Sequence, residues 1–265
     1  MTGARATAAV PLRVAVIGKG GAGKSMIAGT MARLIARQGV PVLALDSDPV
    51  PGLSLTLGSG PDPVRPPLVD AARQDDKGQW GWSDGITAAI AAQRFATDAP
   101  DGVRLLQRGK PEPKGSRAIL PASKAFWEVA HGLVDAPEFR DWTLIGDLPA
   151  GPYQVADDWA PYAQHYLVVV QPTMQSAMTA RRVARLARMR TPGAAVVMIA
   201  NRVRDEDDVR HVEKLVREPV FASVPADEDV AAAERLGQAP IDVAPESAAV
   251  AAIGQLIARL SAEAR

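Results

Sequence analysis

Short apolar runs alternate with helix-like stretches along most of the chain. Several runs are apolar at successive positions, which is typical of strands buried on both faces of a parallel sheet. The predicted strands are Leu12–Ile17, Val42–Leu45, Val103–Leu106, Thr143–Gly146, Tyr166–Val170, Ala195–Ala200 and Val220–Val224. The predicted helices include Ser25–Gln38, Ser123–Leu133, Gln175–Met189 and Glu206–Arg217. This alternation predicts an α/β fold with a doubly wound, mostly parallel sheet flanked by helices.

Proline, glycine and charged residues interrupt the alternation over residues 58–82. This composition predicts a long loop or insertion, and such segments in a compact domain are usually functional or mobile. Trp80 and Trp82 stand beside glycines in this segment and are candidate anchors for a protein partner. We expect a flexible lead over residues 1–11 and a single domain over residues 12–265.

Composition narrows the classes of function. The chain has 265 residues, of which 47% are hydrophobic, and this is ample for a core. Its 30 basic and 30 acidic residues balance, so no bulk charge attracts nucleic acid or acidic lipid. The absence of cysteine excludes disulfides, thiolate-bound zinc and iron–sulfur clusters. We expect a cytoplasmic protein, because the start lacks the apolar core of a signal peptide and no apolar run approaches the roughly 20 residues of a membrane span.

A glycine-rich segment follows the first predicted strand and opens the first predicted helix. Gly18–Ser25 fits the pattern G-x-x-x-x-G-K-[ST] of a P-loop NTPase. Its glycines let the backbone wrap around phosphates, and the dipole of the following helix favours the same negative charge. Lys24 would contact the β- and γ-phosphates, and the Ser25 hydroxyl would ligate Mg²⁺. The alternative is a glycine-rich turn without a ligand. The expected nucleotide-binding residues of this loop are Gly18, Lys19, Gly20, Gly21, Ala22, Gly23, Lys24, Ser25 and Met26.

The loop carries a second lysine near its start. The segment "KGGAGKS" resembles the deviant phosphate loop of the MinD/ParA ATPases, a group that includes the nitrogenase iron protein and the nickel-insertion ATPase CooC. In that family the early lysine reaches across a dimer interface to phosphates bound by the other subunit. The resemblance therefore implies catalytic roles for Lys19 and Lys24, ATP and Mg²⁺ as cofactors, and a homodimer that forms on ATP binding. The alternative for Lys19 is a solvated loop cation.

Two acidic segments extend the resemblance. "DSDP" follows the second predicted strand and looks most like the CooC-type switch I, so Asp48 would position or activate the attacking water and Asp46 would support the Mg²⁺ shell. "DLPAG" follows the fourth and resembles the family's Walker B and switch II, so Asp147 would hold Mg²⁺ through water and Gly151 would let the loop respond to the γ-phosphate. Carboxylates at the carboxyl ends of such strands face the nucleotide crevice. The alternative for the first segment is a turn, since Asp, Ser and Pro favour turns.

The resemblance continues to about Val243 and implies which residues contact the adenine base. Asn201 ends a predicted strand in "VMIANRV", where the family's Asn bonds the adenine edge. "FASVPADEDVAAAERLGQAPI" matches a late family pattern, so the Pro225 and Ala226 backbone would flank the base.

The chain departs from the family in two places. Met26 replaces a Thr that contacts the α-phosphate in most relatives, which removes one hydrogen bond worth about 1 kcal/mol. Ser116 and Ala118 stand where CooC-like and nitrogenase-like relatives carry a Cys-x-Cys. Without thiols the chain cannot hold an intersubunit cluster or carry nickel on thiolates. The three histidines are too scattered to suggest a replacement site: His131, His165 and His211.

These features favour a Mg-ATP-dependent dimeric switch that acts on an unidentified protein partner, with metalloenzyme assembly as a candidate service. A second hypothesis is a positioning ATPase that acts on DNA or membrane. DNA is not favoured, because the arginines of "TARRVARLARMR" also fit the solvated face of a helix whose buried stripe is Val183, Leu186 and Met189. Membrane binding is not expected, because the C-terminal amphipathic segment carries Glu246 and Glu263 and fits a helix packed on the sheet.

A P-loop small-molecule kinase is a third hypothesis. A scaffold that binds nucleotide without hydrolysing it is a fourth, and the presence of Asp48 argues against it.

Overall fold

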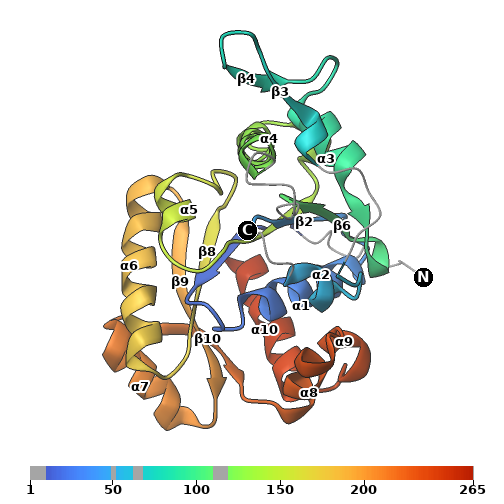
Figure 1. Ribbon diagram of the computed structural model, residues 1–265. Coiled ribbons are helices and arrows are strands. Elements are labelled where there is room, and N and C mark those ends of the chain that lie inside the picture. Colours follow the sequence, from blue (N-terminus) through green and yellow to red (C-terminus); the bar gives the residue numbers. More distant parts are fainter. Residues whose placement is uncertain (1–9, 49–51, 62–67, 110–118, 265) are drawn as a thin grey trace, which may run out of the picture.

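An eight-stranded sheet forms the centre of the computed structural model, which describes residues 10–48, 52–61, 68–109 and 119–264 (Figure 1). The strand order is β10-β9-β8-β1-β7-β2-β6-β5. Neighbouring strands are parallel, except that β5 runs antiparallel to β6. The strands are β1 (Arg13–Gly18), β2 (Val42–Asp46), β5 (Thr97–Asp98), β6 (Arg104–Gln107), β7 (Thr143–Asp147), β8 (His165–Val170), β9 (Ala195–Val203) and β10 (Val220–Pro225). The predicted fold class and each of the seven predicted strands are confirmed.

Both faces of the sheet are covered, as the alternation along β1 illustrates. Ala15 and Ile17 belong to one buried cluster, whereas Val14 and Val16 belong to a second cluster on the other face. The first face packs against α3 (Ala88–Phe95), α4 (Ile119–Gly132), α6 (Met174–Arg190) and α7 (Glu206–Val216). The second face packs against α1 (Lys24–Ala36), α2 (Leu53–Leu57), α8 (Glu228–Leu236) and α10 (Ala248–Glu263). The described residues also form two short helices, α5 (Tyr153–Ala156) and α9 (Pro240–Val243).

The described residues of the predicted loop or insertion include short regular elements. A 3₁₀ turn at Leu68–Ala71 leads into a hairpin of β3 (Ala72–Gln74) and β4 (Trp80–Trp82), which projects from the body beside α4 (Figure 1). The carboxylate of Asp75 closes the turn by accepting the backbone N–H groups of Lys77 and Gln79. Trp82 is partly buried against the core cluster of the first face. Sequence patterning missed these strands because each has three residues.

The buried side of helix α6 differs from the predicted stripe of Val183, Leu186 and Met189. Its buried side is made of small residues together with Val183: Ser176, Ala177, Ala180, Ala184 and Ala187. Leu186 is partly buried, but Met189 is 64% exposed. Because the buried side is mostly alanine, the helix can lie close to the sheet, and the longer side chains fall outside the contact.

The C-terminal helix α10 packs on β10 and α1, as predicted. Ser247 caps its amino end, with the Ser247 hydroxyl accepting the Val250 N–H at 3.2 Å, and the helix buries Ile253, Leu256 and Leu260. Among the described residues, no helix is both long and apolar enough to cross a bilayer.

Candidate nucleotide site

The glycine-rich loop joins the carboxyl end of β1 to the amino end of α1. Gly21 and Gly23 have φ values of 74° and 95°, which L side chains rarely adopt. A Cβ at Gly18 would lie 2.5 Å from the Val169 carbonyl oxygen, and a Cβ at Gly23 would collide with the Asn201 amide nitrogen. These positions therefore require glycine, and the loop that results places backbone N–H groups at a helix amino end, where anions bind.

The two lysines of the loop have different surroundings. Lys24 is buried at 7% exposure, and its charge lowers the pKa of Asp147. Lys19 is partly exposed and forms no ion pair with any residue that the structure describes. The buried lysine belongs to its own site, whereas the other is accessible from outside.

Two carboxylates meet at the floor of the loop. Asp46 of β2 and Asp147 of β7 are paired in register, and both are at most 2% exposed. The Ser25 hydroxyl donates to Asp147 Oδ2 at 2.5 Å. Burial raises the pKa of Asp147 to about 6, although the charge of Lys24 and the Ser25 hydrogen bond lower it in part. Burial, and then the charge of Asp147, raise the pKa of Asp46.

The same pair fits a divalent cation. Asp147 Oδ1 is buried and has no hydrogen-bond partner among the described residues. Two carboxylates and a hydroxyl are hard oxygen donors of the kind that Mg²⁺ prefers. A cation held there would relieve the electrostatic cost that the raised pKa values record.

The segment after β2 is hydrogen-bonded to the segment after β7. Ser47 Oγ donates to Gln154 Oε1 at 2.6 Å, and Gln154 Nε2 donates to the Ser47 carbonyl oxygen at 3.3 Å. Gly151 N–H donates to the Gly18 carbonyl oxygen at 3.3 Å, which ties this segment to the phosphate loop. Asp48 is partly exposed, and its N–H donates to Asp46 Oδ1 at 3.1 Å. Sequence reasoning missed Gln154, because only the fold brings it beside Ser47.

Arg108 is a second residue that the sequence did not reveal. It follows β6, and its N–H donates to the Asp46 carbonyl oxygen at 2.9 Å. Its guanidinium carbon lies 5.8 Å from the centroid of the Trp159 ring. Burial lowers the pKa of Arg108, and the charges of Asp48 and Asp46 oppose that effect. The site therefore contains a cation near Asp46 and Asp48 in addition to the two loop lysines.

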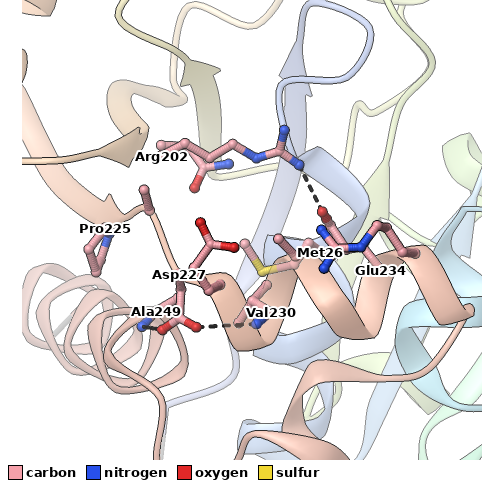
Figure 2. A pocket seen from close by; sticks show the side chains of 12 residues that line it. Met26, Arg202, Pro225, Asp227, Val230, Glu234 and Ala249 are labelled. Atoms are coloured by element: carbon pink, nitrogen blue, oxygen red, sulfur yellow. Dashed lines mark hydrogen bonds and ion pairs between the residues drawn. The ribbon is translucent and has the colours of Figure 1, made fainter.

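A pocket of about 450 Å³ adjoins the loop (Figure 2). Four of the predicted residues line it: Met26, Asn201, Pro225 and Ala226. Asn201 is fully buried; its Nδ2 donates to the Ala22 carbonyl oxygen at 2.7 Å, and its Oδ1 has no hydrogen-bond partner among the described residues. The carbonyl contact fixes the orientation of the amide, which leaves its acceptor unpaired.

The family profile described as CbiA, the CobQ/CobB/MinD/ParA nucleotide binding domain, matches residues 14–251. The chain belongs to this MinD/ParA-type family. An uncharacterized ATP-binding protein of Methanocaldococcus jannaschii is 29% identical over 244 residues, which are 88% of this chain and 91% of the relative. The carbon monoxide dehydrogenase accessory protein CooC of Rhodospirillum rubrum is 24% identical over 246 residues, which are 88% of this chain and 91% of that protein.

Solved structures show the same family fold. A ParA family ATPase of Chlorobium tepidum has a TM-score of 0.70 at 22% identity and is covered over 98% of its length, with 94% of this chain. MinD of Pyrococcus horikoshii, solved with Mg-ADP, has a TM-score of 0.69 at 22% identity, with 95% of this chain and 94% of that chain covered. The MinD/ParA-type chain is therefore a P-loop NTPase in fold.

Ser116 and Ala118 of this MinD/ParA-type chain, at the positions predicted for a Cys-x-Cys, lie outside the described residues. Within the described ranges, no group of three His, Asp or Glu side chains is arranged to hold a metal ion. His131 instead contacts the Asp158 carbonyl oxygen at 2.9 Å through Nε2, and His165 is buried in β8.

Proposed function

We propose that this chain is a Mg²⁺-dependent ATPase that dimerises on binding ATP and changes its affinity for a protein partner when it hydrolyses ATP. The observation that carries the proposal is the buried Asp46–Asp147 pair, with Ser25 at 2.5 Å from Asp147 and Lys24 buried at the same loop. Such a pair is costly without a bound cation, and a site for a metal–triphosphate complex explains why it is retained.

The base pocket supports ATP over GTP. Asn201 Nδ2 donates one N–H to the Ala22 carbonyl oxygen, and Asn201 Oδ1 has no hydrogen-bond partner among the described residues, so this oxygen is the group left to pair with a base. The exocyclic amine of adenine donates a hydrogen bond, whereas guanine carries a carbonyl acceptor at the equivalent position. Pairing the buried acceptor favours adenine, because an unsatisfied buried oxygen carries a desolvation cost.

The proposed chemistry assigns a role to each polar residue. Ser25 and Asp147, with Asp46 behind them, would hold Mg²⁺, which neutralises charge on the β- and γ-phosphates when bound. Lys24 binds the phosphates within its own subunit. Asp48 accepts a hydrogen bond from the attacking water and orients it toward the γ-phosphate. Backbone N–H groups of the loop hold the product phosphates.

Lys19 acts from the second subunit in this proposal. It is partly exposed, and Gln171 Nε2 donates to the Gly21 carbonyl oxygen at 3.3 Å, which ties the loop to the start of α6. Nearby on α5 and α6, Tyr153, Met174 and Met178 are 80%, 59% and 64% exposed. Exposed apolar side chains beside a cation of this kind support burial by a second copy of the chain.

The test is the mass in solution, by light scattering, with Mg-ATP, Mg-ADP or no nucleotide. We expect an ATP-dependent dimer that persists in Asp48→Ala and does not form in Lys19→Ala. A monomeric mass with ATP bound, unchanged by Lys19→Ala, contradicts the dimer. In that case the small-molecule kinase is the better hypothesis, and transfer of the γ-phosphate to an acceptor would support it.

The partner class rests on similarity to CooC, which is named as an accessory protein of carbon monoxide dehydrogenase. We propose service to a metalloenzyme by conformational change, since a chain without cysteine cannot carry metal on thiolates. The second candidate is DNA positioning, because Arg181, Arg182 and Arg185 are exposed on α6. Salt-sensitive DNA binding that requires ATP would favour it.

A further inference from the structure

An extra residue interrupts the pairing of β9 with β10 at the mouth of the base pocket. Asn201 pairs with Val224, but the next pair joins Val203 to Pro225, so Arg202 has no partner in the ladder. Arg202 has a φ of 58°, a left-handed conformation that is uncommon outside glycine and asparagine. Bulges of this kind re-aim a side chain and are concentrated beside functional sites.

The bulge directs Arg202 across the pocket to α8. Arg202 Nη2 lies 2.8 Å from Glu234 Oε2, and both residues line the pocket. Figure 2 shows the Arg202 side chain extended along one side of the pocket with its guanidinium at Glu234. Met26, Pro225 and Val230 supply apolar surface to the same pocket.

Folding stability does not account for this arrangement. The side chains of Arg202 and Glu234 are 47% and 28% exposed, and ion pairs with such exposure contribute little to stability. The left-handed backbone at Arg202 is itself unfavourable. A strained residue that is held by a weak ion pair at a pocket points to a ligand.

The neighbouring wall of the pocket is fixed more firmly. Asp227 caps two helices, because Oδ1 accepts the Val230 N–H at 3.2 Å and Oδ2 accepts the Ala249 N–H at 3.3 Å (Figure 2). Opening that wall would break helix caps. Opening the Arg202–Glu234 pair breaks only a part-exposed contact, so this side can move while the fold is intact.

We propose that Arg202 covers the base of the bound nucleotide, with its planar guanidinium stacked on the aromatic ring and held there by Glu234. The ion pair then sets how long a nucleotide stays bound. Guanidinium groups stack on aromatic faces, and the ion pair with the Glu234 carboxylate would hold the guanidinium plane of Arg202 in position. This inference rests on the proposed function, since it requires a nucleotide in the pocket.

The test is the dissociation rate of fluorescently labelled ADP from the full chain, chased with unlabelled ADP. Arg202→Ala should accelerate dissociation by roughly five- to thirty-fold, the range of a cation–aromatic contact. Glu234→Gln should give a smaller increase, Arg202→Lys should recover little, and the double variant should match Arg202→Ala. Arg210→Ala is the matched control, because Arg210 is an exposed arginine paired with Glu206 and Asp207 on α7.

Inorganic tripolyphosphate has phosphates but no base, so its binding distinguishes contacts to the base from contacts to the phosphates. Its affinity, measured by competition, should be equal in the wild type and in Arg202→Ala. An unchanged ADP dissociation rate in Arg202→Ala overturns the inference and leaves the proposed function intact. An equal loss of tripolyphosphate affinity also overturns it. A wild-type chain that binds no adenine nucleotide overturns both proposals.

Discussion

Asp46 and Asp147 lie opposite each other on adjacent parallel strands, buried and in register, at the point where the phosphate loop meets the sheet. Without a cation this arrangement favours protonation, and burial raises the pKa of Asp147 to about 6 from its ordinary value of 3.8. The stabilising contribution of protonated Asp147 is fully present below pH 3.8 and is lost as the pH rises through about 6.

Replacing this carboxylate should therefore stabilise the nucleotide-free protein. Asp147→Asn keeps an acceptor for Ser25 and removes the buried charge, so the free energy of unfolding should rise by about 3 kcal/mol at pH 7.5 and about 1 kcal/mol at pH 4.5. Denaturant unfolding with a chelator present measures both values. Asp84→Asn is the control, because the side chain of Asp84 is 84% exposed. An equal gain at the two pH values would contradict the explanation.

Selection of the base should depend on Asn201. Asn201→Ala removes the unpaired acceptor, so ATP affinity should fall about ten-fold while GTP affinity changes little. Competition of the two nucleotides against a labelled ADP measures the ratio. A thermal melt of the same sample reports how much stability is lost with the Ala22 contact. Parallel losses for ATP and GTP would show that Asn201 supports the loop without reading the base.

The seven longer strands of the central sheet were predictable from sequence because each contains a short apolar run bounded by turns. The hairpin and β5 were not, because strands of two or three residues have no usable periodicity. Loop residues such as Lys24 and Ser25 were found by spacing within one segment. Gln154, Arg108 and Arg202 were missed, because their roles depend on contacts between distant segments or on a bulge that no local pattern encodes.

The same substitution at two glycines should have opposite effects. Gly23→Ala forces an unfavourable φ of 95° and a collision with Asn201, so it should cost about 2 kcal/mol or more and abolish nucleotide binding. Gly254 lies within α10 with no heavy atom near an added Cβ. Gly254→Ala should stabilise the protein by about 0.5–1 kcal/mol and leave binding unchanged. Denaturant unfolding and nucleotide titration measure both effects.

Equal destabilisation by the two alanines would contradict the geometric requirement at the loop. Retained binding in Gly23→Ala would do so as well, because it would mean that Asn201 moves aside without consequence. Gly193→Ala is a further control, since that glycine also has open space around an added Cβ and lies outside the helices.

The hydrogen bonds between Ser47 and Gln154 connect the segment after β2 to the segment that follows Asp147. If this link carries the response to the γ-phosphate, Gln154→Ala should reduce the single-turnover rate of ATP hydrolysis while leaving the dissociation constant for ATP unchanged. Loss of one such contact corresponds to about 1 kcal/mol, or roughly five-fold in rate. Gln175→Ala is the matched control, because Gln175 is exposed on α6. A fall in ATP affinity with no change in rate would assign Gln154 to binding, because the switch segments would then close equally well without it.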